Sequence, residues 1–163
     1  MSRLVATFFC LGYLRPAPGT WASASAVVLG VLAYRAGAPW AIPAGAVLAT
    51  LAGFWAIPGA LAGGEDTDPS EIVIDEVAGQ LLAFSFTAIP LARHNADILA
   101  AWPGFVAPFL LFRLFDIWKP WLVGRADRRG DAAGVMLDDL WAGLFAGVVS
   151  VILAGVYHGI LMR

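Results

Sequence analysis

Long apolar stretches separated by short polar segments run through most of the chain and predict helices that cross a membrane. A helix needs about 20 mainly apolar residues to span the hydrocarbon of a bilayer, and somewhat fewer where flanking side chains snorkel. The stretches that meet this requirement are residues 40–62, 77–91, 98–117 and 140–162. A shorter stretch, residues 21–34, predicts a marginal span or a helix packed among the others. Residues 4–14 are typical of an interfacial or re-entrant segment.

Composition agrees with this pattern. The chain has 163 residues, of which 60% are hydrophobic and 13% are charged. It is therefore too apolar for a water-soluble domain and too short for several domains. We expect an all-α fold, a polytopic membrane helix bundle of about four to five spans, that forms a single integral-membrane domain over residues 1–163.

Charge and cysteine content exclude some classes of protein. The formal net charge is -2, whereas a surface that binds nucleic acid needs massed Lys and Arg, so we expect no nucleic-acid partner. Cys10 is the single cysteine of the chain, which excludes a disulfide framework and a Cys/His zinc site.

The positive charges predict the orientation of the bundle. Lys119, Arg125, Arg128 and Arg129 gather in one loop, and loops rich in Lys and Arg stay in the cytoplasm. Counting spans outward from this loop puts residues 65–76 on the same side. Because most of the acidic residues fall either in that segment or between residues 116 and 139, we expect an acidic site at the cytoplasmic face. Carboxylates near hydrocarbon are costly, so such a cluster indicates function.

The first acidic segment predicts a metal site. Asp68 precedes Pro69 and suits a turn or a helix start, and Glu71 and Asp75 share one face if a helix begins near Ser70. Like charges at that spacing repel unless a cation lies between them, and Mg²⁺ favours oxygen ligands. A solvated acidic loop is the alternative, and it suits Glu65 and Asp66 better than the acids that enter the apolar helix.

The second segment combines cations with an acid. Arg113, Asp116 and Lys119 are spaced three apart, so they line one side of a helix that Pro120 ends. Arg and Lys beside carboxylates suit a phosphate whose cation the acids hold. The alternative is a structural pair between Arg113 and Asp116 that closes the helix end.

The third segment places two adjacent aspartates, Asp138 and Asp139, at the predicted start of a long apolar helix. The helix dipole favours acids there, and one of them could serve as a cap. Adjacent side chains on a helix point about 100° apart, so the other would face inward.

A weaker signal precedes the shorter apolar stretch. Gly19 and Thr20 could present backbone N–H groups to a phosphate, with Arg15 adding positive charge. The alternative is a turn into a membrane helix in which Thr20 is the cap.

These motifs resemble the phosphatidylglycerophosphatase A family. The matching segments are residues 17–21, 72–79, 112–120 and 134–143, in the order that the family has them. The resemblance implies an all-helical, Mg²⁺-dependent phosphatase. It would remove the terminal phosphate of phosphatidylglycerophosphate in the bilayer to give phosphatidylglycerol, at the bacterial inner membrane.

On this basis we assign roles to the candidate residues. Asp75, Glu76, Asp138 and Asp139 are expected to bind Mg²⁺, with Glu71 and Asp116 as outer ligands or water-orienting groups. Arg113 and Lys119 are expected to hold the substrate phosphate, and Asp68 is the candidate base. The metal would polarise the phosphoryl oxygens for in-line attack by water.

Rival functions leave different patterns. An aspartyl-phosphate enzyme would place Asp66 and Asp68 after a hydrophobic strand, whereas they follow Gly63 and Gly64. A lipid phosphotransferase would carry spaced aspartates and glycines on one helix. A small cation transporter would spread its acids through the depth of the bundle. Another lipid-phosphate phosphatase would share the same motifs, so that alternative stays open.

Overall fold

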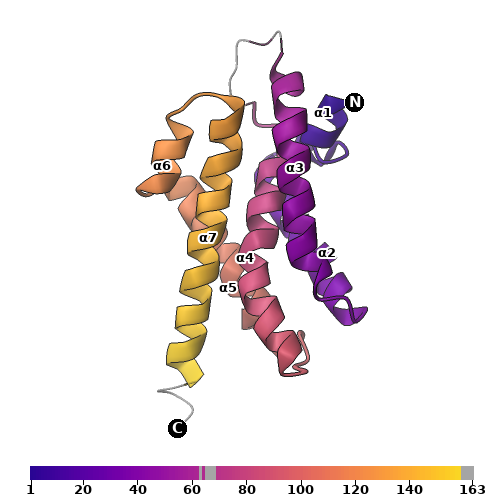
Figure 1. Ribbon diagram of the computed structural model, residues 1–163, viewed down its shortest axis with the longest axis vertical. Coiled ribbons are helices and arrows are strands. Elements are labelled where there is room, and N and C mark those ends of the chain that lie inside the picture. Colours follow the sequence, from indigo (N-terminus) through magenta and orange to yellow (C-terminus); the bar gives the residue numbers. More distant parts are fainter. Residues whose placement is uncertain (63, 65–68, 159–163) are drawn as a thin grey trace.

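The computed structural model describes residues 1–62, 64 and 69–158, and within these residues the regular structure is entirely helical. The elements, in chain order, are α1 (Ser2–Ala6), the 3-10 helix η1 (Leu11–Tyr13), α2 (Pro18–Arg35), α3 (Ala41–Leu61), α4 (Ile74–Arg93), α5 (Pro103–Trp118), α6 (Leu122–Asp127) and α7 (Ala132–Val156). They form an elongated bundle in which α4 and α7 both begin at the same end, uppermost in Figure 1. The predicted all-α fold is confirmed.

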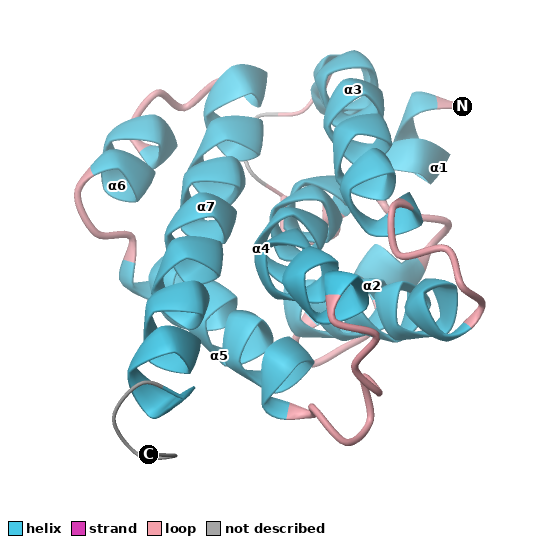
Figure 2. Cartoon of the chain, turned by 60° about the horizontal axis from the view of Figure 1, so that its bottom comes forward, coloured by secondary structure: helices cyan, strands magenta, loops and turns pink. Residues whose placement is uncertain are grey.

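Helix α4 is the centre of the bundle. It packs against α2, α3, α5 and α7, and Figure 2 shows these helices arranged around it. In its most apolar stretch, 67% of the residues are buried, compared with 28% in α3 and 33% in α7. The first turn of α4 therefore delivers its side chains to a place where several helices meet.

Small residues let α4 and α7 approach closely. A Cβ atom built on Gly143 of α7 would lie 3.0 Å from the Cα atom of Gly79 on α4. A Cβ atom on Gly79 would lie 2.6 Å from the Phe112 ring and 3.0 Å from the carbonyl carbon of Asp139. Since real Cβ atoms do not come that close, only glycine fits at these contacts. The contact holds the backbone of Asp139 beside the beginning of α4.

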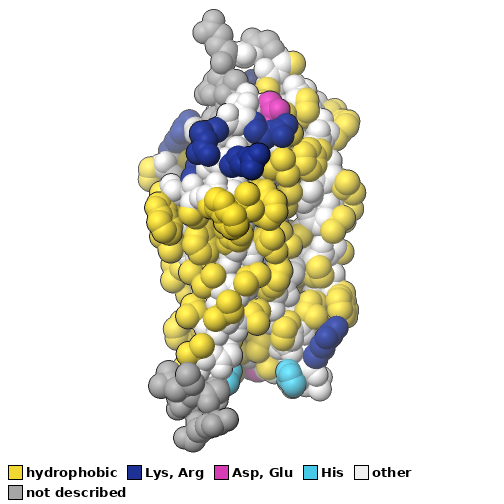
Figure 3. Space-filling view, turned by 60° about the vertical axis from the view of Figure 1, so that its left-hand side comes forward, with side chains coloured by type: hydrophobic (Ala, Val, Ile, Leu, Met, Phe, Trp, Pro, Cys, Tyr) yellow, Lys and Arg dark blue, Asp and Glu magenta, His cyan; other side chains and the backbone are white. Residues whose placement is uncertain are grey.

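Three helices are long and apolar enough to cross a membrane: α3, α4 and α7. They correspond to predicted spans 40–62, 77–91 and 140–162, so these three predictions are matched by candidate membrane helices. Many large apolar side chains on these helices are exposed, including Leu48, Trp55 and Ile152. The face of the molecule drawn in Figure 3 carries a broad hydrophobic belt. Water-soluble monomers rarely expose an apolar surface of that extent.

The other two expected spans differ from the prediction. Helix α5 starts only at Pro103 and has 16 residues, which is short of the length a typical span needs. Helix α2 has 18 residues but is not among the three apolar helices, since polar residues, Arg35 above all, lower its mean hydropathy. The expected count of four to five spans is therefore not confirmed.

The N-terminal segment folds against the site end of the bundle. Residues 4–14 contain the end of α1, a turn with positive φ at Phe8, Phe9 and Cys10, and η1. The backbone N–H of Val73 donates to the carbonyl of Ala6 at 3.0 Å. This hydrogen bond ties the N-terminal segment to the residue that precedes α4.

Two helix starts differ from the sequence prediction. Helix α4 begins at Ile74 rather than near Ser70, so Glu71 lies outside the helix and does not share a helical face with Asp75. Helix α7 begins at Ala132, and Asp138 and Asp139 therefore lie in its second turn. The expectation that these aspartates open the helix, and that one of them caps it, is wrong.

Candidate active site

The first turn of α4 supplies two carboxylates. Asp75 and Glu76 follow directly on Ile74, at the end of the helix where the dipole favours negative charge. The Asp75 carboxylate accepts a hydrogen bond from the backbone N–H of Glu76 at 3.0 Å, and its residue is only 6% exposed. The apolar residues on either side bury this turn, so its acids enter the protein interior.

The second turn of α7 supplies two more. Asp138 and Asp139 are 6% and 3% exposed, and the Asp138 carboxylate accepts from the backbone N–H of Asp139 at 3.0 Å. The helix cap is a different residue, Asp131, whose carboxylate accepts from the N–H of Gly134 at 2.7 Å and from Arg129 at 3.0 and 3.1 Å. An aspartate immediately before an apolar run, as Asp131 is here, is a helix-start signal that the sequence already contains.

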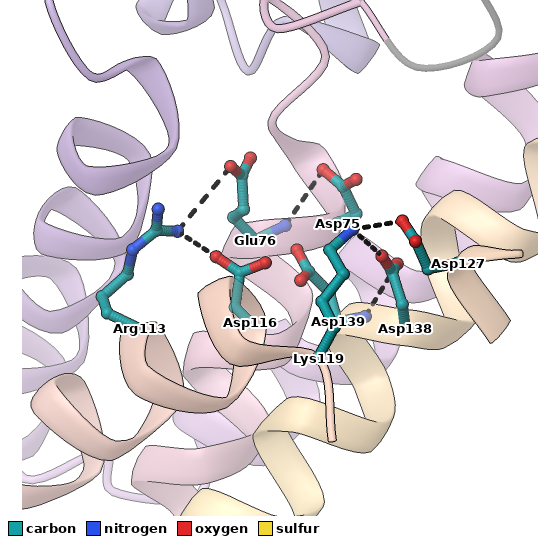
Figure 4. Close-up of polar contacts among 8 residues, drawn as sticks. All are labelled: Asp75, Glu76, Arg113, Asp116, Lys119, Asp127, Asp138 and Asp139. Atoms are coloured by element: carbon teal, nitrogen blue, oxygen red, sulfur yellow. Dashed lines mark hydrogen bonds and ion pairs between the residues drawn. The ribbon is translucent and has the colours of Figure 1, made fainter. Parts of the chain in front are cut away.

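Carboxylate oxygens of Asp75, Glu76 and Asp139 all lie within 4.8 Å of one another. Hard divalent cations such as Mg²⁺ bind through carboxylates in this way, usually completing their coordination with water or substrate phosphate. The donor set therefore fits the ion that the sequence predicts. Asp138 stands beside this group, with its carboxylate turned toward Lys119 (Figure 4).

Two cations border the carboxylates from α5 and the residue that follows it. Arg113 Nη1 lies 2.7 Å from Asp116 Oδ2 and 3.8 Å from Glu76 Oε1. The pair between Arg113 and Asp116, which the sequence left as a structural alternative, is thus present, and it also faces the acidic group. Lys119 adopts the left-handed conformation after α5 ends at Trp118, which turns its side chain back toward α7.

Lys119 is held between two acids. Its ammonium group donates to Asp127 and to Asp138, the latter at 3.0 Å. Burial by itself lowers the pKa of Lys119, but the hydrogen bonds and charges of the two aspartates outweigh it and raise the pKa above its ordinary value of 10.5. The group therefore stays positive at neutral pH. Asp127 was not among the predicted residues, because only the turn at Lys119 brings it into reach.

The charges of this group do not balance. The residues labelled in Figure 4 include six carboxylates and only two cations, a formal excess of four negative charges when all are ionised. Close carboxylates in a poorly hydrated place cannot all stay ionised unless a cation joins them. This excess is a second reason to expect a divalent ion.

A cavity of about 260 Å³ opens onto these side chains. Its lining consists of residues from α2, α4, α5 and α7 and the segments next to them: Ala17, Pro18, Gly19, Ser70, Ile72, Asp75, Glu76, Arg113, Asp116, Lys119, Asp138 and Asp139. Residues that are far apart in the sequence and were predicted separately thus meet in one cavity.

Gly19 lies close against the acidic group. A Cβ atom on Gly19 would come within 2.7 Å of the Glu76 carboxyl carbon and 3.2 Å of Arg113 Nη1. A larger residue at position 19 would therefore displace the Glu76 carboxylate from its place in the group. Thr20 lies inside α2, whose cap is Ala17 and has no side-chain hydrogen bond, so the interpretation of Thr20 as a cap is wrong. Arg15 donates to Ser70 Oγ at 3.1 Å, next to the cavity rather than in its lining.

Two other predicted residues are not part of the group. The carboxylate of Glu71 lies 2.9 Å from Arg3 Nη2, outside the cavity lining. Asp68, the candidate base, lies outside the described residues, as do Glu65 and Asp66.

Buried carboxylates beside an arginine and a lysine at one end of a helical bundle suit an enzyme that acts on phosphate groups. The model of one family, Phosphatidylglycerophosphatase A, matches residues 4–154. The chain belongs to this family and is a phosphatase.

Individual relatives agree with the family match. The chain is 31% identical over 147 residues to the phosphatidylglycerophosphatase A of Haemophilus influenzae, with 90% of this chain and 84% of the relative covered. It is 33% identical over 151 residues to a Bacteroides thetaiotaomicron protein provisionally named phosphatidylinositol-3-phosphatase, with coverages of 90% and 89%. The Escherichia coli phosphatidylglycerophosphatase A matches over 84 residues at 33% identity, 50% of this chain and 43% of that protein. No solved structure matches the chain.

Proposed function

We propose that this protein hydrolyses the terminal phosphomonoester of phosphatidylglycerophosphate to give phosphatidylglycerol, in a Mg²⁺-dependent step of glycerophospholipid biosynthesis. The family and the names of two relatives support the substrate. The observation that carries the mechanism is the convergence of Asp75, Glu76 and Asp139 beside two cations. The bacterial inner membrane, with the cavity on the cytoplasmic side, is the proposed location, because the Lys and Arg residues of 119–129 lie at this end.

The metal is assigned to the acids that lie closest together. Asp75, Glu76 and Asp139 would hold Mg²⁺, and Asp138 would keep Lys119 oriented toward the cavity. When bound, the ion supplies charge neutralisation for the phosphoryl oxygens and helps to align water for in-line attack. Glu71 is not proposed as a metal ligand, because its carboxylate pairs with Arg3.

The cations are assigned to the phosphate. The Arg113 guanidinium is fixed by Asp116, which lies 2.7 Å from its Nη1 atom, and its planar fork suits phosphoryl oxygens. Lys119 adds a compact positive charge from the other side of the cavity. Both would stabilise the negative charge that spreads over the phosphoryl oxygens in the transition state.

The proton balance of the reaction needs a base and an acid. Water attacks phosphorus, the bond from phosphorus to the glycerol oxygen breaks, and the departing glycerol oxygen takes up a proton. Asp116 is placed to orient the water, since it lines the cavity next to Arg113. Asp68 remains the proposed base, on the strength of its place in the sequence alone.

The location of the cavity suits a lipid headgroup. It lies at the beginnings of α4 and α7, which are both candidate spans, and therefore near the boundary between hydrocarbon and water. A phosphate attached to a membrane lipid reaches that depth without leaving the bilayer. A cation transporter would need acids through the bundle, whereas the buried acids of the described residues are Asp75, Asp138 and Asp139, all at this end.

A second headgroup has support of its own. The Bacteroides thetaiotaomicron relative, which the chain matches along most of its length, carries a name that refers to phosphatidylinositol 3-phosphate. The same residues would serve either phosphomonoester, because the metal and the two cations contact the phosphate rather than the alcohol.

The test is phosphate release by the purified protein in detergent, with Mg²⁺ or with EDTA. Phosphatidylglycerophosphate, phosphatidic acid and phosphatidylinositol 3-phosphate are offered separately. Asp139→Asn is compared with Asp97→Asn, a matched control beyond the other end of α4, where the exposed carboxylate accepts from the N–H of Leu99 at 2.9 Å. We expect Mg²⁺-dependent release, fastest from phosphatidylglycerophosphate, that is lost in Asp139→Asn alone. No release by folded wild type, or equal release with EDTA, would contradict the proposal.

A further inference from the structure

A second groove lies between α6 and α7, with a volume of about 420 Å³ and none of its lining residues in common with the first cavity. Its lining consists of two arginines and four mainly apolar residues: Leu122, Arg125, Ala126, Arg129, Leu137 and Trp141. We propose that this groove binds an anionic phospholipid, with the phosphate at the arginines and an acyl chain along α7. The proposal concerns binding without turnover and does not rest on the proposed function.

The arginines of the groove differ in their partners. Arg129 is held by Asp131 through two hydrogen bonds of 3.1 and 3.0 Å, which fix its position at the start of α7. Arg125 is exposed and forms no ion pair among the described residues. The neighbouring acid, Asp127, is already bound to Lys119. Arg125 therefore presents an uncompensated positive charge at the groove.

The opposite wall is apolar and continues into the hydrophobic belt. Leu137 and Trp141 are four residues apart on one face of α7. Below them the Phe145 ring lies 6.1 Å from that of Trp141 and 6.4 Å from that of Trp121, which stacks on it and is 79% exposed. Tryptophans gather where a membrane protein meets the headgroup region. An acyl chain that leaves the groove along α7 thus meets aromatic and aliphatic surface.

The surface view shows that positive charge and apolar surface adjoin at this end of the molecule. Lys and Arg side chains gather near one end of the molecule, immediately above the hydrophobic belt (Figure 3). A ligand there needs a negative group at the level of the arginines and an apolar part directly below it. A membrane phospholipid has that form and reaches the groove by lateral diffusion. Nucleic acid and acidic peptides lack the long apolar part.

The test compares two arginines that are three residues apart. Wild type, Arg125→Gln and Arg128→Gln are purified in a neutral detergent, and binding of phosphatidylglycerol and of phosphatidylcholine is measured by native mass spectrometry. Both substitutions remove one exposed positive charge, but only Arg125 lines the groove. We expect one saturable phosphatidylglycerol site, about tenfold weaker in Arg125→Gln and changed less than about twofold in Arg128→Gln. Phosphatidylcholine should bind more weakly to wild type.

A third variant separates the groove from the catalytic cavity, because phosphatidylglycerol is also the proposed product. Arg113→Gln removes a cation from the cavity and leaves the groove intact. Saturable binding that persists in Arg113→Gln and is lost in Arg125→Gln would support the groove. Binding lost only in Arg113→Gln, or weakened equally in Arg125→Gln and Arg128→Gln, would overturn it. Melting temperatures in lipid-free detergent confirm that each variant is folded.

Discussion

The two halves of α7 have similar apolar sequences but opposite surroundings. In the first half, Asp138, Asp139 and Gly143 are buried against neighbouring helices. In the second half the large apolar side chains face outward, with Val148 41% exposed and Ile152 56% exposed. Apolar composition alone therefore does not decide what a membrane helix contacts. Small residues on the neighbouring helix decide which part is covered, and only the covered part carries carboxylates.

The glycines of α7 show the same difference. A Cβ atom on Gly143 would meet the backbone of Gly79, whereas a Cβ atom on Gly155 would meet nothing within 4 Å. Close packing in the first half positions Asp139 against α4. In the second half Ala146, Gly147 and Ser150 are still buried, and a Cβ atom on Gly147 would meet the Phe86 ring. From Val151 to the end of the helix every residue is exposed, so this last part needs only length and apolar surface, which lipid accepts from many sequences. The predictions below are substitutions at the start, in the first half or in the second half of α7. Comparing their effects on activity and stability tests the difference between the two halves.

The largest expected effect is the loss of activity in Asp139→Asn. The amide keeps the shape of the side chain but removes one of the clustered negative charges that would hold the metal. Initial rates of phosphate release should fall by on the order of 10²–10³-fold, while the melting temperature stays the same or rises, since a buried charge is relieved. If Asp139→Asn retained more than about half of the wild-type rate, the proposal that the buried first half of α7 supplies a residue for catalysis would be contradicted.

A smaller effect is expected from Gly143→Ala. The added methyl group would have to push α7 away from Gly79, whose Cα atom lies 3.0 Å from the new atom. Overpacking of this kind costs about 1–3 kcal/mol of unfolding free energy, and the shift would also separate Asp139 from Asp75. Thermal unfolding and phosphate release measure the two consequences.

Gly155→Ala is the matched control for that substitution. With open space around it, alanine should leave activity unchanged and stabilise the helix by up to about 1 kcal/mol. Equal destabilisation by the two substitutions would show that close packing extends to the exposed end of α7.

The cap of α7 gives a pH-dependent prediction. The hydrogen bond from Arg129, reinforced by the N–H of Gly134, holds the pKa of Asp131 below its ordinary value of 3.8. Because the folded state lowers this pKa, the cap stabilises the protein above the ordinary value and is lost as the pH falls through the folded value. Asp131→Ala should therefore melt at a lower temperature than wild type at pH 7.

The difference between Asp131→Ala and wild type should shrink in acid, once the native Asp131 carboxylate is protonated too. Melting curves of both proteins across the acidic range provide the measurement. A gap that stays constant as the pH falls would mean that the charge of Asp131 contributes nothing to the cap.

The smallest effect is expected in the outward-facing half. Ile152→Leu exchanges one apolar side chain for another at a position that is 56% exposed, so melting temperature and activity should stay close to those of wild type, within about 0.5 kcal/mol of stability. A large loss would indicate that the second half of α7 packs against something specific rather than lipid.

The sequence predicted which side chains meet in the cavity better than it predicted where the helices begin and end. Asp75, Glu76 and Asp139 were recognisable because acids that interrupt apolar stretches have few structural explanations. Helix α5 was predicted too long, since the apolar residues before Pro103 form a turn that hydrophobicity alone does not distinguish from helix.

Other features depend on contacts between distant segments. Asp127 reaches Lys119 only because the chain reverses in the left-handed conformation at the end of α5. Glu71 was assigned to the metal because a helix was expected to begin near Ser70, whereas in the structure its carboxylate pairs with Arg3 of the N-terminal helix α1. Spacing along one helix cannot predict either partner.

The central claim is that the acids at the heads of α4 and α7 bind a divalent cation. Titration of the purified protein with Mn²⁺, followed by electron paramagnetic resonance, measures this binding without any substrate. We expect saturable Mn²⁺ binding that excess Mg²⁺ displaces, lost in Asp139→Asn and retained in Asp97→Asn. Absence of saturable binding by folded wild type, or unchanged binding in Asp139→Asn, would contradict the account.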